Sequence, residues 1–284
     1  ELISLPESLC NIYDRFEFFS VSNNNLCPGS FPTCISASKI ENQVCLGCPP
    51  SYFLIEGYCA WESDYNILQN FLDLNPESQS LPAQTGVPDV ASHCVNEDWW
   101  NGGRLVEISF QHKQLTSEIP ENLGDLDRLQ ILRLNSNQLT GGIPDNITNL
   151  NNLKILKLNS NSLSGSIPEN IGALSNLDSL YLSYNNFTGE IPTSITEIDS
   201  LTYLALDNNI LTGILPEHIG SIDSLKYLYL DNNQLSGEIP QSMGDLKVLR
   251  TLSIYKNELS GQIPENICNL YENDLGLQIS FRAL

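Results

Sequence analysis

The side chains that most often perform catalysis are few and scattered in this 284-residue sequence. Its three histidines, His93, His112 and His218, lie far apart along the chain. The sequence has no Gly-x-Ser-x-Gly, His-Glu-x-x-His or Gly-Lys-Ser/Thr motif, which mark hydrolases, zinc proteases and phosphate-binding loops. Neighbouring acids such as Glu97 and Asp98 are more typical of a solvated surface than of acid–base catalysis. We therefore predict a protein that is not an enzyme and that uses no cofactor or metal.

Cysteine is the other chemically capable residue, and six of the eight cysteines fall between Cys10 and Cys59. Dense cysteine in a short segment is typical of disulfide-bonded extracellular modules, which are too small to bury a large core. A Cys-x-x-Cys spacing also fits a zinc site, which is the alternative interpretation of Cys34, Cys45, Cys48 and Cys59. The disulfide candidates are Cys10, Cys27, Cys34, Cys45, Cys48, Cys59 and Cys94.

The composition is strongly acidic, with 34 aspartates and glutamates against 13 lysines and arginines and a net charge of -21. We expect no nucleic-acid partner, because phosphates are neutralised by basic residues. No apolar run approaches the ~20 residues that a membrane helix needs, so we expect no membrane span in this chain. The first residues, ELISLPESLC, lack the basic start and apolar core of a signal peptide, and we expect a mature product or a fragment.

Two sequons for N-linked glycosylation agree with an extracellular location, Asn146-Ile147-Thr148 and Asn186-Phe187-Thr188. Asn266-Ile267-Cys268 is a weaker form of the same signal. We expect glycans at Asn146 and Asn186 on a protein that is secreted or displayed at the cell surface.

One phrase recurs through most of the chain, as in LKLNSNSLSGSIP and LYLDNNQLSGEIP. A fixed period of 24 residues predicts a solenoid, because no single repeat can bury its own apolar layer and neighbours must stack on it. The alternation in Leu156-Lys157-Leu158 predicts one short strand per repeat. The repeats begin at Leu105, which opens a weaker first repeat, and at Leu129, Leu153, Leu177, Leu201, Leu225 and Leu249.

An asparagine follows the leucines of each strand, where the chain turns inward and its backbone groups lack a sheet partner. Buried unpaired backbone groups cost free energy, and an amide side chain offers both donors and acceptors. We therefore predict a structural ladder rather than a binding site at these positions, which are Asn137, Asn161, Asn185, Asn209, Asn233 and Asn257. The first repeat has Lys113 instead.

The repeated pattern L-x-x-L-x-L-x-x-N-x-L-x-G-x-I-P resembles the plant-type subclass of leucine-rich repeats, which also occurs outside plants. The resemblance implies an α/β leucine-rich-repeat solenoid with a parallel β-sheet on its concave face. Short 3-10 or turn segments would form the convex face. It also implies binding rather than catalysis.

Two further resemblances concern the region before the repeats. CLGCPPSYFLIEGYC resembles the cysteine-rich repeats of growth-factor-receptor and furin-like proteins. CVNEDWWNGGRLVEISF resembles the plant-type cap C-x-x-W-x-G-V-x-C but lacks its second cysteine, so Cys94 has no family partner. SDYNILQNFLDLNP predicts a helix capped by Ser63 or Asp64.

These patterns divide the chain into four segments. A disulfide-stapled cysteine-rich module covers residues 1–60, and an amino-terminal cap covers 61–104. Seven repeats cover 105–272, and a partial terminal strand around LQISF lies in 273–284.

Residues beside the inward leucines point out of the concave face. Basic residues and tyrosines gather there, whereas most acids of the repeats fall in the Ile-Pro and convex segments, so we expect a less acidic concave face. Tyrosine combines apolar area with a hydroxyl and suits protein or sugar recognition. Alternatively, the tyrosines only pack side by side on a solvated sheet. The candidate binding face comprises Arg133, Lys157, Tyr181, Tyr184, Tyr203, Tyr227, Tyr229 and Tyr255.

The leading functional hypothesis is an extracellular interaction module that binds a protein or glycan on the concave face. The alternative is a structural subunit of an extracellular fibre or matrix that joins itself head to tail. Cys268 bears on this choice, because it is either a buried free thiol or half of an intermolecular disulfide. Ice binding by the polar ladders is a weaker third hypothesis.

Overall fold

The computed structural model describes residues 52–55, 58–75, 100–101, 104–267 and 278–280. The chain forms two compact bodies. The amino-terminal body takes residues 1–72 and 82–106, and the solenoid body takes residues 73–81 and 107–284. Cys59 is described by its backbone alone, and the other seven cysteines lie outside the described residues. The predictions of disulfides, of a zinc site and of an intermolecular bond therefore stay predictions.

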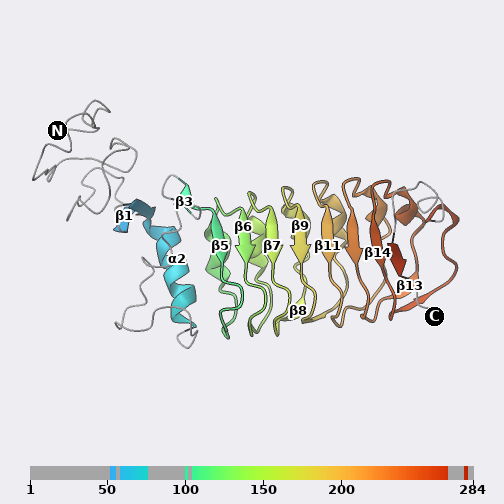
Figure 1. Ribbon diagram of the computed structural model, residues 1–284, viewed down its shortest axis with the longest axis horizontal. Helices are drawn as coiled ribbons and strands as arrows, with labels where there is room; N and C mark the ends of the chain where they lie inside the picture. The colour runs from blue at the N-terminus through green and yellow to red at the C-terminus, as the bar shows by residue number, and fades with distance from the viewer. Residues whose placement is uncertain (1–51, 56–57, 76–99, 102–103, 268–277, 281–284) are drawn as a thin grey trace, which may run out of the picture. The chain divides into compact units, whose positions relative to one another are not determined.

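The solenoid body is built on one eight-stranded parallel sheet, which confirms the predicted leucine-rich-repeat fold. Each repeat contributes one strand of three residues, and the inward leucines of neighbouring strands lie opposite one another, as Leu132 does with Leu156. Figure 1 shows the strands side by side in chain order. They are β5 (Glu107–Ser109), β6 (Ile131–Arg133), β7 (Ile155–Lys157), β9 (Ser179–Tyr181), β11 (Tyr203–Ala205), β12 (Tyr227–Tyr229), β14 (Thr251–Ser253) and β16 (Gln278–Ser280). The strand predicted within LQISF is therefore present as β16.

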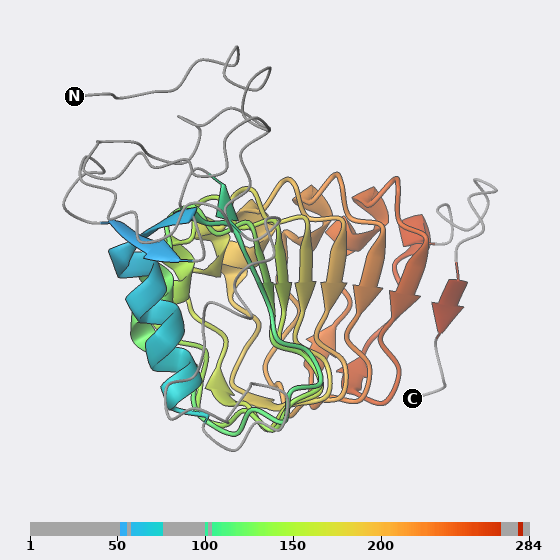
Figure 2. The ribbon, with the colours of Figure 1, turned by 60° about the vertical axis from the view of Figure 1, so that its left-hand side comes forward.

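A short 3-10 segment lies on the other side of each of six coils (Figure 2). In four of the six, the proline of the Ile-Pro motif is the residue just before the segment, where its missing N–H is no loss. Gly220 allows close stacking here, because a Cβ at its position would lie 1.8 Å from the carbonyl oxygen of Ser242 in the next coil. The segments are η4 (Glu121–Asp125), η5 (Asp145–Asn149), η6 (Ile171–Ala173), η7 (Thr193–Glu197), η8 (Ile219–Ser221) and η9 (Gln241–Asp245).

Two smaller parallel pairs, absent from the sequence prediction, join the coils beyond the main sheet. β8 (Ser164–Ser166) pairs with β10 (Asn186–Thr188), and β13 (Ser236–Glu238) pairs with β15 (Glu258–Ser260). Glycine and serine fill half of these positions, and such residues carry little strand signal. These pairs are set by the stacking of coils rather than by local preference.

Each ladder asparagine forms side-chain hydrogen bonds with backbone groups of its own coil and of the preceding coil. In Asn161, the Oδ1 atom accepts the Leu139 N–H at 3.1 Å. Its Nδ2 atom donates to the carbonyl of Leu134 at 3.0 Å and to that of Leu158 at 2.9 Å. The same three kinds of bond recur at Asn137, Asn185, Asn209, Asn233 and Asn257.

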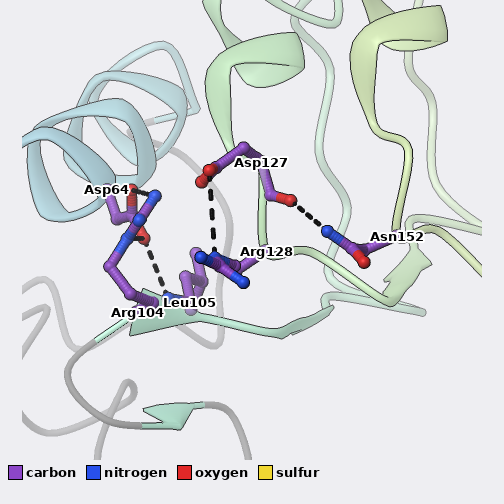
Figure 3. Close-up of polar contacts among 6 residues, drawn as sticks. All are labelled: Asp64, Arg104, Leu105, Asp127, Arg128 and Asn152. Carbon is purple, nitrogen blue, oxygen red and sulfur yellow. Dashed lines mark hydrogen bonds and ion pairs between the residues drawn. The ribbon is translucent and has the colours of Figure 1, made fainter.

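A second set of polar side chains bonds successive coils just before the start of three repeats. Asn152 donates from Nδ2 to the carbonyl of Asp127 at 2.7 Å (Figure 3). Asn176 and Ser200 bond the preceding coil in the same way. Val248 holds the equivalent position later in the chain and cannot donate a hydrogen bond.

Asn75 forms hydrogen bonds with the backbone of the first coil, and the sequence analysis did not predict this role. It is 2% exposed, and its Oδ1 atom accepts the N–H groups of Thr116 at 2.8 Å and Ser117 at 3.0 Å. Its Nδ2 atom donates to Ser117 Oγ at 2.7 Å. Backbone groups of this coil are therefore satisfied by a residue from before the repeats.

The described part of the amino-terminal body contains two short antiparallel pairs and one helix. β1 (Tyr52–Ile55) pairs with β2 (Tyr58–Trp61), and β3 (Trp100–Asn101) pairs with β4 (Arg104–Leu105). The helix is α2 (Glu62–Asp73). It begins before Ser63 and Asp64, so the prediction that one of them caps it is wrong.

Asp64 has a different role, because it anchors β4. Its carboxylate accepts the Leu105 N–H at 2.9 Å and the Nε and Nη2 groups of Arg104 at 3.0 and 3.3 Å (Figure 3). Asp64 is 1% exposed. Buried charges in proteins are usually paired, and Arg104 provides that pairing for Asp64.

Replacing Asn185 with alanine should lower the free energy of unfolding by ~2 kcal/mol, because the buried Leu163 N–H would lose its acceptor. Equilibrium urea unfolding of the full chain measures this change. Asn176→Ala is the matched control, since Asn176 is exposed and makes one bond between coils. Its expected cost is below ~0.5 kcal/mol. Equal losses in the two variants would contradict the structural role of the ladder.

Candidate binding face

The candidate site is the outward side of the main sheet, which we call the open face. In β6, β7 and β12 the middle residue is buried and its two neighbours are partly exposed. This alternation is the ordinary geometry of a strand with one covered side. Six of the eight predicted binding residues lie in these strands and in β9 and β11, namely Arg133, Lys157, Tyr181, Tyr203, Tyr227 and Tyr229.

Four of the tyrosines form one cluster across three adjacent strands. The rings of Tyr181 and Tyr203 stack with centroids 4.3 Å apart and planes 25° from parallel. Tyr203 also contacts Tyr227 at 5.3 Å and Tyr229 at 5.5 Å between centroids. Tyr203 is therefore the centre of this tyrosine cluster.

Ala205 makes room for this arrangement. In the strand register it lies between Tyr181 on β9 and Tyr229 on β12. Ala205 is only 4% exposed although it stands on the outward side of its strand. The small side chain does not extend between the neighbouring tyrosines, and the rings of Tyr181 and Tyr229 both contact that of Tyr203.

Burial affects the titration of the cluster. Removal from water disfavours the charged phenolate and raises the pKa of Tyr203, and the neighbouring Tyr229 and Tyr181 hydroxyls raise it further. The pKa of Tyr181 is also raised, again chiefly by burial. Both hydroxyls are therefore neutral across the physiological range and act as hydrogen-bonding groups.

A cation lies at one side of the tyrosine cluster. Lys157 Nζ is 4.4 Å from the centroid of the Tyr181 ring, within the range of a cation–π interaction. Burial lowers the pKa of Lys157, and the nearby Arg133 lowers it further. Within the described residues Lys157 has no ion pair, whereas Arg133 is paired with Glu107 at 2.5 Å and bonded to Ser109 Oγ at 3.1 Å. Lys157 is therefore the cation on this side that is still available to an anionic group.

Carboxylates stand just past the ends of β11 and β12, and the sequence analysis did not include them in the site. Asp207 accepts hydrogen bonds from Ser183 Oγ at 2.5 Å and from Asn208 Nδ2 at 2.7 Å. Asp231 is 6% exposed and accepts a bond from Asn232 Nδ2 at 2.6 Å. The sequence analysis expected a less acidic face and did not anticipate these two carboxylates at the ends of the strands. Both aspartates directly follow the last leucine of a strand motif. This shared position in the repeat could have predicted that they lie together beside the open face.

Tyr184 and Tyr255 lie apart from the tyrosine cluster. Tyr184 follows β9 in a left-handed conformation with φ of 56° and is 60% exposed. Tyr255 follows β14, and its ring contact is with Lys256, whose Nζ is 5.7 Å from the centroid. These two residues belong to the turns beyond the strands rather than to the sheet surface.

Within the described residues no group of three or more His, Cys, Asp and Glu side chains could hold a metal ion. His112 and His218 are both exposed and lie in different coils. No helix in the described part of the chain is long and apolar enough to cross a membrane.

Comparisons with known proteins agree with the leucine-rich-repeat fold. Residues 127–187 and 199–259 match the leucine rich repeat family model. A comparison with curated proteins found no match. The fold is therefore a leucine-rich-repeat solenoid, and the family model matches its repeats over those two stretches.

Solved structures of plant receptors show the same fold. The chain is 34% identical to the plant peptide hormone receptor RGFR1, solved with RGF2, with a TM-score of 0.60 over 62% of this chain and 28% of that one. It is 38% identical to the Arabidopsis receptor kinase HAESA, solved with the peptide hormone IDA and the co-receptor SERK1, with a TM-score of 0.57 over 58% and 28%. It is 31% identical to PEPR1 in the PEPR1–AtPEP1 structure, with a TM-score of 0.67 over 78% and 31%. The chain thus spans about three tenths of the length of each receptor chain.

The raised pKa of Tyr203 makes stability depend on alkaline pH. The unfolded chain loses this proton near pH ~10, whereas the folded chain retains it to higher pH. The free energy of unfolding should therefore fall as pH rises above ~10. Tyr203→Phe should reduce that fall, measured by urea unfolding at intervals between pH 8 and about 11. The same slope in both proteins would contradict the burial of this hydroxyl.

Proposed function

We propose that this chain is the ligand-binding part of an extracellular leucine-rich-repeat protein and that its open face binds an extended segment of a peptide or protein. The observation that carries the proposal is the tyrosine cluster on β9, β11 and β12, with Lys157 beside it and no carboxylate paired to that lysine within the described residues. A solvated sheet without a ligand does not require either feature.

The chemistry of the open face suits an extended peptide. Tyrosine rings offer large apolar area at a small cost in side-chain entropy, and their hydroxyls can bond backbone groups of a ligand. Tyrosine is also enriched among the residues that dominate binding energy in protein interfaces. Lys157 would bond a ligand carboxylate or carbonyl at one side of the cluster.

The comparisons support a protein ligand and an extracellular location. RGFR1, HAESA and PEPR1 have the same fold. RGFR1 is described as a plant peptide hormone receptor, and HAESA as a receptor kinase in complex with a peptide hormone. A related structure is described as the ectodomain of a plant membrane receptor kinase. The chain covers only part of the length of these receptors, so peptide binding by this chain is a proposal.

A glycan ligand would use the same tyrosines, but none of these comparisons supports one. The fibre and ice-binding hypotheses also lack support from the comparisons. The cysteine on which the fibre hypothesis rests, Cys268, is outside the described residues. The peptide or protein ligand is therefore the function that the open face supports best.

A selection from a phage-displayed library of random peptides tests this proposal. We expect enrichment of peptides that bind the wild-type chain, and Tyr203→Ala should weaken the selected peptides at least ~10-fold, or about 1.4 kcal/mol. Affinities of the synthetic peptides are measured by calorimetry. Circular dichroism of each variant confirms that the solenoid is folded.

Tyr184→Ala is the matched control, because it removes an exposed tyrosine that lies outside the cluster. It should leave the affinity of the selected peptides within ~2-fold of wild type. The proposal fails if no peptide is enriched, or if Tyr203→Ala and Tyr184→Ala bind the selected peptides equally well.

A further inference from the structure

Exposed apolar side chains flank one of the two full sequons. Tyr184 is 60% exposed and Ile210 is 39% exposed, and both belong to the few large hydrophobic residues that the described solenoid leaves open to water. Asn186 of the sequon lies two residues after Tyr184. Single exposed hydrophobic residues need no explanation, but this pair borders a modification signal.

Tyr184 lies in the bend before β10, and Asn186 is the first residue of that strand. Asn185, between them, is buried and donates from Nδ2 to the carbonyl of Leu158 at 3.1 Å. Phe187, the next residue, is completely buried. Tyr184, Asn186 and Thr188 are all exposed. The tyrosine and the sequon asparagine are therefore both at the surface, separated in the chain by the buried Asn185.

Ile210 approaches the sequon from the next coil. Its N–H donates to the carbonyl of Phe187 at 2.9 Å, which places it beside the sequon residues of β10. Ile214, four residues later, is 61% exposed. The sequon thus has an aromatic ring before it in the chain and an aliphatic side chain beside it.

We propose that Asn186 carries an N-linked glycan whose first N-acetylglucosamine packs against Tyr184 and Ile210. One face of this sugar consists largely of C–H groups, which are attracted to the negative face of an aromatic ring and lose water on apolar contact. In the attachment step, Asn186 Nδ2 forms a bond to the anomeric carbon of a lipid-diphosphate-linked oligosaccharide. The bond from that carbon to the diphosphate breaks, the lipid diphosphate leaves, and the amide proton passes to a base.

The other asparagines of this kind lack these surroundings. Pro144 is two residues before Asn146, and the nearby Ile143 and Ile147 are only 6% and 1% exposed. Asn266 already donates from Nδ2 to the carbonyl of Gln241 at 2.7 Å. A sugar on Asn146 would extend into water, so this sequon provides an internal control for Asn186.

The test uses the full chain secreted from a eukaryotic host that makes oligomannose glycans, with occupancy measured by mass spectrometry. An endoglycosidase that leaves one sugar on each asparagine should not change the melting temperature. Asn186→Gln should lower it by ~2 °C, whereas Asn146→Gln should leave it unchanged. Tyr184→Ala should lower the melting temperature of the glycosylated chain by a similar amount and that of the Asn186→Gln chain much less.

Three results would overturn the proposal. The first is that Asn186 is unmodified in the secreted protein. The second is that Asn186→Gln has the melting temperature of the wild type. The third is that Tyr184→Ala lowers the melting temperature equally with and without the sugar. None of these results depends on the ligand of the open face, so this inference fails or stands separately from the proposed function.

Discussion

No coil of the solenoid can satisfy its own backbone or bury its own apolar layer, and this constraint governs the structure. Where the chain leaves each strand, backbone groups turn inward and would be unpaired in an isolated repeat. The ladder asparagine of the next coil accepts the N–H, as Asn185 does for Leu163, and donates to carbonyls of both coils. Stability is therefore shared between neighbours, as expected for a repeat protein.

The same constraint leaves the open face free to vary. The inward leucines and the asparagine ladder hold each coil, so the outward residues of the strands are not needed for stacking. That face carries an ion pair between Arg133 and Glu107, a tyrosine cluster centred on Tyr203, and carboxylates near the ends of β11 and β12. A regular scaffold thus presents an irregular surface, which is the requirement for selective binding.

Most of the solenoid could be predicted from the sequence, because one period determines strand, asparagine and proline positions together. Features that depend on contacts between particular coils could not. The position of the small Ala205 between Tyr181 and Tyr229 depends on which residues are neighbours across three strands. The roles of Asp64 and Asn75 depend on pairings more than 40 residues apart in sequence, where no repeat provides a register.

Amide hydrogen exchange on the full chain tests the central claim most directly. Leu139 and Leu163 lie outside the strands, yet their N–H groups are bonded to ladder asparagines of the following coil. If neighbouring coils complete one another, these amides will be as protected as the strand amides of β7 and β9 and will exchange only when the coils separate. Exchange at the rate of an unfolded peptide, while the strands stay protected, would contradict this account.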